Sequence, residues 1–420
     1  MKTAQWTLAA GIIGAALTGC TALLGSYDVG AGSADAGGST SDGQGSDGNV
    51  TGADGSVGED GSASDAPVVC TGSDVACGKV CAPLSTSRDH CGKCGHSCGG
   101  ATCQAGQCQP LQLFTGTDAV GRLDVADINV FFASTDGVAS NRLLACPKSG
   151  CTVAPTQIAS MSYPINQVAV VQKGAVVFES APTQSTERPT LYACGIAGCP
   201  SPPVSFTQDG LNGYEGRLRV VADRVFYNSG GNGLAWSSCA ANGGPCTAAH
   251  FLGSAGSAKG TTGFSADTTN VYFVDSMARG SAIATCLQTD TACMPAPLVA
   301  GPQSDVFTTA ADGGKLYWIK RGRDGFTEAK LFVCDLPGCA TPKPIAVGLD
   351  SPTELVVDAS GAYWLTAGNK LQRCSPGGCA GGPQDFAGTP TALDSPHSLV
   401  ADAAFVYWAE KSSVWRLAKP

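Results

Sequence analysis

The sequence predicts an all-β fold, a seven-bladed β-propeller preceded by a small disulfide-rich module and a disordered linker. Three observations predict it. A short aromatic phrase recurs seven times in the second part of the chain, at intervals of 44 to 49 residues. Closely spaced cysteine pairs recur in the same part of the chain. Helical periodicity is absent after residue 108, so the repeating unit is built from strands.

The chain begins with a segment typical of export. Lys2 precedes an apolar stretch that is too short to span a bilayer as a mature helix. The stretch ends in "LTGC", which resembles the bacterial lipobox and implies that 1–19 is a lipoprotein signal peptide. The resemblance also implies that Cys20 carries acyl chains such as palmitate, and several chains on one residue anchor stably. The alternative is an ordinary secretory signal with a cysteine there by chance.

The lipobox resemblance implies a location in the bacterial cell envelope, with the protein held to a membrane by its N-terminal lipid. Thr21 follows the cysteine. By resemblance to enterobacterial sorting, a residue other than Asp at this position implies the outer membrane. We expect everything after Cys20 to lie outside the cytoplasm, facing either the periplasm or the surface.

Residues 20–66 are expected to be the lipidated cysteine followed by a disordered tether. Gly, Ser, Ala and Asp dominate 25–66, and Lys and Arg are absent from it, so it cannot bury enough apolar surface to become ordered. Its Asp-Gly pairs also suggest calcium repeats, but their spacing is irregular. The tether carries most of the net charge of −9, and the nearly neutral remainder excludes nucleic-acid binding, which needs a basic surface.

The 21 cysteines indicate an oxidising compartment. Apart from Cys20 they divide into a cluster of eight within 67–108 and six close pairs within 109–420, so none is left without a potential partner. The cluster is Cys70, Cys77, Cys81, Cys91, Cys94, Cys98, Cys103 and Cys108. The pairs are Cys146/Cys151, Cys194/Cys199, Cys239/Cys246, Cys286/Cys293, Cys334/Cys339 and Cys374/Cys379.

The cluster contains "CGKCGHSCGGATCQAGQC" (91–108), which resembles the stigma-specific cysteine-rich family of plants and its bacterial look-alikes over about 35 residues. Where that family has "VDL" and "NCG", this chain has "APL" (82–84) and "HCG" (90–92). We expect four disulfides, because so small a segment has a minimal core. A zinc module is the rival interpretation, since Cys91 and Cys94 have metal-ligand spacing. The sequence leaves the connectivity open.

The aromatic phrase identifies the repeat in 109–420. Its copies are "NVFFAS" (129–134), "AVVFES" (175–180), "RVFYNS" (224–229), "NVYFVD" (270–275), "KLYWIK" (315–320), "GAYWLT" (361–366) and "FVYWAE" (405–410). Each unit contains four short strands in about 45 residues, as in a propeller blade. The aromatic pairs could form a carbohydrate platform, but at strand positions in every blade they are expected to be core.

We expect each cysteine pair to bridge the hairpin between the third and fourth strands and to staple the outer edge of its blade. The last unit, 398–420, ends after its third strand. "PLQLFTG" (110–116) is similar to the fourth strands of other units. The N-terminal strand is therefore predicted to complete the seventh blade and close the ring.

The segment "LVADAAFVYWAEKSSVWRL" resembles YWTD and NHL propeller repeats, best in the last three blades. The resemblance implies binding of proteins, peptides or glycans, and some relatives are hydrolases or lyases. YWTD propellers usually have six blades and this chain counts seven, which puts any transfer of their ligand sites in doubt.

The candidate binding face combines inter-blade and intra-blade loops. "LDSPTEL" (349–355) and "LDSPHSL" (393–399) supply Asp350, Ser351, Asp394, Ser395 and His397, which are expected to face the central channel. The alternative is that Asp-Ser-Pro only makes the turn. The loop 320–329 adds the charge cluster Lys320, Arg321, Arg323 and Asp324, either as a solvated loop or as a partner contact.

Catalytic motifs are absent from the sequence. It contains neither a G-x-S-x-G elbow nor a phosphate loop, and its four histidines are His90 and His96 in the module and the isolated His250 and His397. We therefore expect a non-catalytic, membrane-anchored binding or scaffolding propeller without a cofactor, whose partner is an envelope or extracellular protein or a glycan. The alternative is a propeller lyase, lactonase or other hydrolase that uses a divalent cation, such as calcium, in the channel.

Overall fold

The computed structural model describes most of the chain after residue 67. The described residues are 68–126, 128–137, 141–171, 174–180, 190–200, 203–207, 218–228, 234–239, 246–247, 250–251, 263–275, 282–289, 296–299, 306–322, 325–379, 381–386 and 393–420. They belong to one compact unit, Ala66–Pro420. The predicted signal peptide, Cys20 and the linker lie outside them. Within the described ranges no helix has the length and apolarity needed to cross a membrane.

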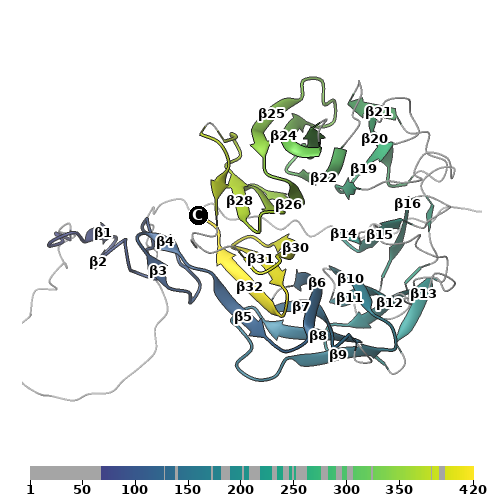
Figure 1. Ribbon diagram of the computed structural model, residues 1–420, viewed down its shortest axis with the longest axis horizontal. Helices are drawn as coiled ribbons and strands as arrows, with labels where there is room; N and C mark the ends of the chain where they lie inside the picture. Colours follow the sequence, from purple (N-terminus) through teal and green to yellow (C-terminus); the bar gives the residue numbers. More distant parts are fainter. Residues whose placement is uncertain are drawn as a thin grey trace, which may run out of the picture. The chain divides into compact units, whose positions relative to one another are not determined.

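Seven four-stranded antiparallel sheets are arranged as blades around a central axis (Figure 1), which confirms the predicted fold class. Blade 1 is β6 (Ala119–Ala126), β7 (Asn129–Thr135), β8 (Asn141–Pro147) and β9 (Thr156–Met161); blade 2 is β10 (Ile165–Val171), β11 (Ala175–Ser180), β12 (Thr190–Gly195) and β13 (Val204–Thr207). Blade 3 is β14 (Arg219–Val221), β15 (Arg224–Asn228), β16 (Leu234–Ser238) and β17 (His250–Phe251); blade 4 is β18 (Phe264–Ala266), β19 (Asn270–Asp275), β20 (Ala282–Leu287) and β21 (Ala296–Val299).

The remaining blades contain the best-conforming copies of the repeat. Blade 5 is β22 (Val306–Asp312), β23 (Lys315–Gly322), β24 (Gly325–Asp335) and β25 (Lys343–Leu349); blade 6 is β26 (Pro352–Asp358), β27 (Gly361–Thr366), β28 (Leu371–Cys374) and β29 (Gln384–Asp385). Blade 7 is β30 (His397–Ala401), β31 (Phe405–Glu410), β32 (Ser413–Ala418) and β5 (Leu111–Thr115).

Blade 7 closes the ring as predicted. Its first three strands come from the end of the chain, and β5 pairs antiparallel with β32 in the register that places Phe114 opposite Val414. The Phe114 ring also lies 4.9 Å from the Phe132 ring of blade 1, measured between centroids. The closing strand therefore joins the last blade by backbone hydrogen bonds and the first blade by packing.

The aromatic phrase forms the second strand of each blade and lies in the core. The side chains at its second aromatic position are at most 3 % exposed; they are Phe132, Phe178, Tyr227, Phe273, Trp318, Trp364 and Trp408. Such large side chains bury the most apolar area per residue, so they fill the space between neighbouring sheets. The core interpretation of the aromatic pairs is confirmed, and the carbohydrate-platform alternative is wrong for these rings.

An aspartate before the aromatic strand explains another part of the repeat. In blade 7 the Asp402 carboxylate accepts hydrogen bonds from the N–H groups of Ala404 (2.9 Å) and Phe405 (2.8 Å) and from the Tyr407 hydroxyl (2.7 Å). In blade 4 Asp267 accepts equivalent bonds from two backbone N–H groups and from the Tyr272 hydroxyl (2.6 Å). One carboxylate thus fixes the turn between the first two strands and also pairs the phenol buried behind it.

The cysteine pairs of the blades form disulfides in the hairpins after the third strands. The described bonds are Cys146–Cys151, Cys194–Cys199, Cys239–Cys246, Cys334–Cys339 and Cys374–Cys379. Cys286 is also disulfide-bonded, and Cys293 lies outside the described residues. The second cysteine of a pair lies in the connection ahead of the fourth strand.

The second cysteine also contacts the preceding blade. The backbone N–H of Cys151 donates to the Leu113 carbonyl of β5 (2.8 Å), that of Cys199 to Ile158 of β9 (3.1 Å), and that of Cys379 to Ile345 of β25 (2.8 Å). In each case the acceptor belongs to the fourth strand of the blade before. The predicted role as a staple within one blade is therefore too narrow: the disulfide holds a turn in the shape that links neighbouring blades.

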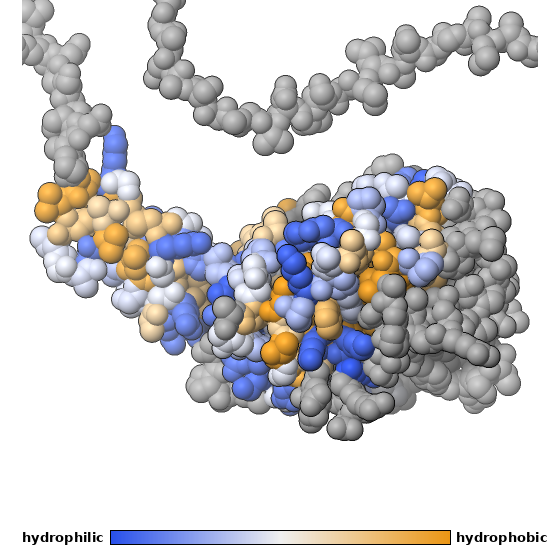
Figure 2. Space-filling view, turned by 90° about the horizontal axis from the view of Figure 1, so that it is seen from above, coloured by the Kyte–Doolittle hydropathy of each residue, from blue (hydrophilic) through white to orange (hydrophobic). Residues whose placement is uncertain are grey.

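The cysteine-rich module contains two small hairpins, β1 (Val75–Cys77) with β2 (Val80–Ala82) and β3 (Cys103–Gln104) with β4 (Gln107–Cys108). Its disulfides are Cys70–Cys81, Cys77–Cys94, Cys91–Cys103 and Cys98–Cys108. Its exposed apolar side chains include Val69, Val75 and Val80, and Figure 2 shows hydrophobic surface at the end of the module away from the propeller. Its inner end shares a buried cluster with Leu417 and Trp408 of blade 7.

Candidate functional site

The two Asp-Ser-Pro turns form the connections into blades 6 and 7. Ser351 and Ser395 adopt positive φ angles of 42° and 53°, which are sparsely populated by non-glycine residues. The Ser351 carbonyl accepts a hydrogen bond from the Ala367 N–H (2.9 Å), and the Asp394 carbonyl accepts one from Lys411 (3.2 Å). These backbone contacts are those that the turn alternative predicts.

His397 has a structural contact on each side of its ring. One ring nitrogen lies 3.0 Å from the Ser395 carbonyl oxygen, and the other lies 2.9 Å from the Val120 carbonyl oxygen of blade 1. The side chain therefore joins blade 7 to blade 1 at the closure of the ring. The carboxylates of Asp350 and Asp394 lie in exposed turns, and their role in binding remains a prediction.

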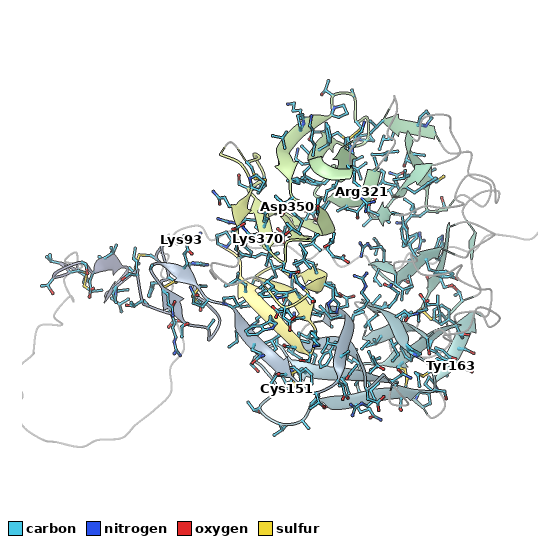
Figure 3. The ribbon with its side chains drawn as sticks, in the orientation of Figure 1. Lys93, Cys151, Tyr163, Arg321, Asp350 and Lys370 are labelled. Carbon is cyan, nitrogen blue, oxygen red and sulfur yellow. A yellow bond between two sulfur atoms is a disulfide. The ribbon has the colours of Figure 1, made fainter. Side chains whose placement is uncertain are left out.

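The predicted charged loop 320–329 is mostly hairpin in the structure. β23 continues to Gly322 and β24 begins at Gly325, and Lys320 lies opposite Lys330 in their register. The expected ten-residue loop is therefore corrected: the two strands continue to pair as far as Gly322 and Gly325, with a register shift between Lys320 and Gly322, so only a short turn remains unpaired. Lys320 and Arg321 lie near the end of β23, just before Gly322, while Arg323 and Asp324 lie outside the described residues. Figure 3 shows Asp350 where blade 5 passes into blade 6, whereas Arg321 is drawn on the side of blade 5 that faces blade 4.

The central channel is lined by the first strand of each blade. Two adjoining cavities of about 350 and 480 Å³ follow it, and both are bordered by Arg219 and by residues 399–401 of β30. Across the channel, the Arg122 guanidinium of blade 1 forms an ion pair with the Glu354 carboxylate of blade 6. Sequence reasoning missed this pair, although charged residues inside the otherwise apolar stretches "GRLDV" and "TELVV" were the available signal.

Asp124 is a second carboxylate of the channel wall, on β6. Its oxygens accept hydrogen bonds from the N–H groups of Val125 (2.8 Å) and Val170 (2.7 Å), the second of which belongs to blade 2. Burial raises the pKa of Asp124 to about 6, and the two backbone hydrogen bonds oppose that shift. The side chain therefore links the inner strands β6 and β10, and both of its oxygens accept hydrogen bonds from backbone N–H groups.

Groups of three or more potential metal ligands occur in the described residues only within the module. They are Cys77, His90 and Cys94, and Cys91, Cys98 and Cys103. All five of these cysteines are joined in the disulfides given above, so their sulfurs are not thiolates. The zinc interpretation of the module therefore lacks deprotonated sulfur ligands in this oxidised form. His250 belongs to β17, but its side chain is outside what the structure describes.

Comparison with known proteins gives similarity in fold alone. No protein-family model matches the chain, and no curated protein matches it. Among solved structures, YCF48 bound to D1 peptide aligns with a TM-score of 0.49 and 11 % identity, over 74 % of this chain and 95 % of that one. The β-propeller domain of the Trilobed protease from Pyrococcus furiosus aligns with a TM-score of 0.49 and 7 % identity, over 71 % and 95 %.

PorZ, a bacterial surface component of the type-IX secretion system of Porphyromonas gingivalis, aligns with a TM-score of 0.49 and 15 % identity. The match covers 74 % of this chain and only 38 % of the PorZ chain. At identities this low, the partners and activities of these proteins cannot be transferred to the present chain. The site of the present chain has to be argued from its own residues.

Proposed function

We propose that the protein is a lipid-anchored component of the bacterial cell envelope, at the outer membrane, whose propeller binds an envelope or extracellular protein or a glycan without catalysis. The "LTGC" segment ending at Cys20 supports the anchor, and the polar linker after it would give the folded part reach above the membrane. The proposal involves no cofactor and no nucleic acid.

The observation that carries the non-catalytic part is the engagement of three charged groups in the channel wall. Arg122 forms an ion pair with Glu354, and the Asp124 carboxylate accepts hydrogen bonds from two backbone N–H groups. General acid–base catalysis or metal binding requires side chains that can exchange a proton with a substrate or offer it a lone pair. Groups held in this way instead stiffen the ring, which favours a rigid support for binding loops.

The test is cross-linking and pull-down of the intact lipidated protein from its own envelope. Cys20→Ala removes the proposed anchor, and it should release the protein from the membrane and lose the partner. Lys320→Glu reverses a charge near the end of β23 without cutting the hairpin. Lys343→Glu, an exposed charge reversal on β25, is the matched control. We expect partner recovery to fall for Lys320→Glu and to remain unchanged for Lys343→Glu.

Two outcomes would contradict the proposal. One is a Cys20→Ala variant that stays with the membrane fraction, which would show that a lipid on Cys20 does not anchor the protein. The other is recovery of no partner, together with a melting temperature that falls in EDTA and returns with calcium. That result would favour the cation-dependent hydrolase or lyase, and mass-action stabilisation by the ion would explain the shift.

A further inference from the structure

A cleft of about 490 Å³ lies between the cysteine-rich module and blades 6 and 7. Its volume falls in the range of roughly 300–1,000 Å³ that is usual for small-molecule sites, and such sites occur preferentially where domains meet. One wall is module backbone around Gly92 and Gly106. The opposite wall comes from β28 and β29 of blade 6, and the end of β32 borders it as well.

The module wall is built from backbone that excludes side chains. Gly92 and Gly106 both have a φ of +75°, and a Cβ atom added to Gly92 would lie 2.5 Å from the Gly106 carbonyl oxygen. Only glycine fits such a contact at positive φ without a shift of the backbone. The Cys91–Cys103 and Cys98–Cys108 disulfides flank these two glycines and hold the wall in place.

The two walls are held together by His96. One of its ring nitrogens lies 2.6 Å from the Cys91 carbonyl oxygen in the module, and the other lies 2.7 Å from the Lys419 carbonyl oxygen that follows β32. The Arg416 guanidinium also donates to the Gly99 carbonyl of the module. These polar contacts accompany the shared buried cluster, so the cleft is part of one packed structure and not a gap between independent bodies.

The cleft carries two cations on different walls. Lys93 belongs to the module wall, and Figure 3 shows it on the side of the module that faces blade 6, where Lys370 is labelled. The Arg373 guanidinium of β28 lies 5.3 Å from the centroid of the Phe386 ring, and it donates to the Gln384 side-chain oxygen (3.4 Å). Among the ion pairs between described residues, none involves Lys93 or Arg373.

The one carboxylate side chain of the described lining is already neutralised. Asp385 accepts hydrogen bonds from the Gln372 amide (2.9 Å) and from the Lys370 ammonium (2.9 Å), and these two contacts hold its pKa below the usual range. Because Asp385 is paired with Lys370, Lys93 and Arg373 are the charged lining side chains that remain for a ligand; the last residue, Pro420, also borders the cleft. A surface lysine alone would be ordinary; here it is combined with an arginine positioned by an aromatic ring and with a preformed concave wall.

We propose that this cleft binds a small organic anion. Its carboxylate or phosphate group would lie between Lys93 and Arg373, and a flat apolar part would pack beside Phe386. The arginine fork matches both kinds of oxyanion in geometry, lysine adds a point charge, and the aromatic ring offers apolar surface next to them. The site shares no residue with the candidate binding face of the propeller, so its failure would leave the proposed function untouched.

Titration of the intact chain with three related probes tests this proposal. Benzoate and phenyl phosphate carry the two oxyanions on a ring, and benzamide is the uncharged counterpart. We expect at least one anion to bind with a Kd of about 1 mM, as suits so few atoms, and benzamide to bind at least tenfold more weakly. A preference for benzoate assigns a carboxylate ligand, and a preference for phenyl phosphate assigns a phosphate ligand.

Three variants locate the binding. Arg373→Met should weaken anion binding tenfold or more, and Gln107→Glu should weaken it by placing a negative charge at the cleft without removing a packing contact of blade 6. Lys79→Met, an exposed change elsewhere in the module, is the control and should leave the Kd unchanged. Equal binding of benzoate and benzamide, no binding of either anion, or an unchanged Kd in both cleft variants would overturn the proposal.

Discussion

The cysteine-rich module and the propeller use disulfides for different purposes. The module has few strands, and cysteines themselves make up most of its buried side chains, including Cys91, Cys98, Cys103 and Cys108. In the propeller the buried volume is filled by aromatic and aliphatic side chains, and each disulfide closes a short turn at the edge. Covalent links thus replace a core in the module and supplement one in the ring.

The disulfides of the two regions also differ in the length of chain they close. The module bonds join cysteines at sequence separations of 10 to 17, whereas the separation is 5 in most of the described blade pairs. Longer loops remove more entropy from the unfolded chain. The comparison therefore predicts a different order of sensitivity in each region, and mutations can test it.

The largest effect should come from the propeller core. Trp364→Ala removes a side chain that is fully buried in blade 6, and we expect a loss of about 3–5 kcal/mol in the free energy of unfolding. Denaturant unfolding of the propeller, with its disulfides intact, measures this. Trp364→Phe is the conservative control, with a smaller loss. If Trp364→Ala lowers the free energy of unfolding by only ~1 kcal/mol or less, the disulfides and not the core stabilise the blade.

The next effect concerns the module. Cys91→Ala combined with Cys103→Ala opens a link between residues 12 apart, and the chain-entropy model gives a loss of about 3 kcal/mol. We expect the module to become sensitive to protease while the unfolding transition of the propeller is retained. If the module stays resistant, its packing on blade 7 supports it more strongly than its own disulfides, and the contrast between the regions fails.

A buried carboxyl group sharpens the description of the propeller. Burial raises the pKa of Glu179 in β11 to about 7, and a hydrogen bond with the Asn166 side chain opposes the shift. The folded state therefore binds more protons than the unfolded state between about pH 4.5 and 7, so stability should fall as pH rises through this window, by up to ~3 kcal/mol.

Glu179→Gln should flatten much of that pH dependence, as measured by the free energy of unfolding at pH 4.5 and 7.5. A residual slope is expected from Asp124, whose pKa is also raised. An unchanged slope in the Glu179→Gln variant would show that the carboxyl group is solvated. Core burial would then be a weaker determinant of propeller stability than the comparison with the module implies.

The smallest effect should come from a disulfide of a blade. Cys374→Ala with Cys379→Ala opens a link between residues five apart, for which the chain-entropy model gives about 2 kcal/mol. The hydrogen bond from residue 379 to the Ile345 carbonyl is made by the backbone, so it survives the substitution and limits the loss. Thermal melting of the propeller measures it. A loss larger than that of the module pair would reverse the order predicted here.

The repeating architecture can be predicted from the amino-acid sequence. The aromatic phrase specified seven second strands, and the missing fourth strand of the last unit together with "PLQLFTG" specified how the ring closes. These features follow from local pattern, because the period-2 alternation of a strand and the composition of a turn are written in neighbouring residues. The closure was accessible for the same reason, since β5 has the composition of the strand it replaces.

The contacts between residues far apart in the sequence could not be predicted in this way. The Arg122–Glu354 pair joins positions 232 residues apart, and the contact of His96 with the Lys419 carbonyl joins positions 323 apart. The bond from the second cysteine of a pair to the preceding blade has no local signal either, nor does the cleft with Lys93 and Arg373. Such contacts depend on the angle between successive blades and on the docking of the module. Those quantities are set by the packing of the whole core and not by any short stretch of sequence.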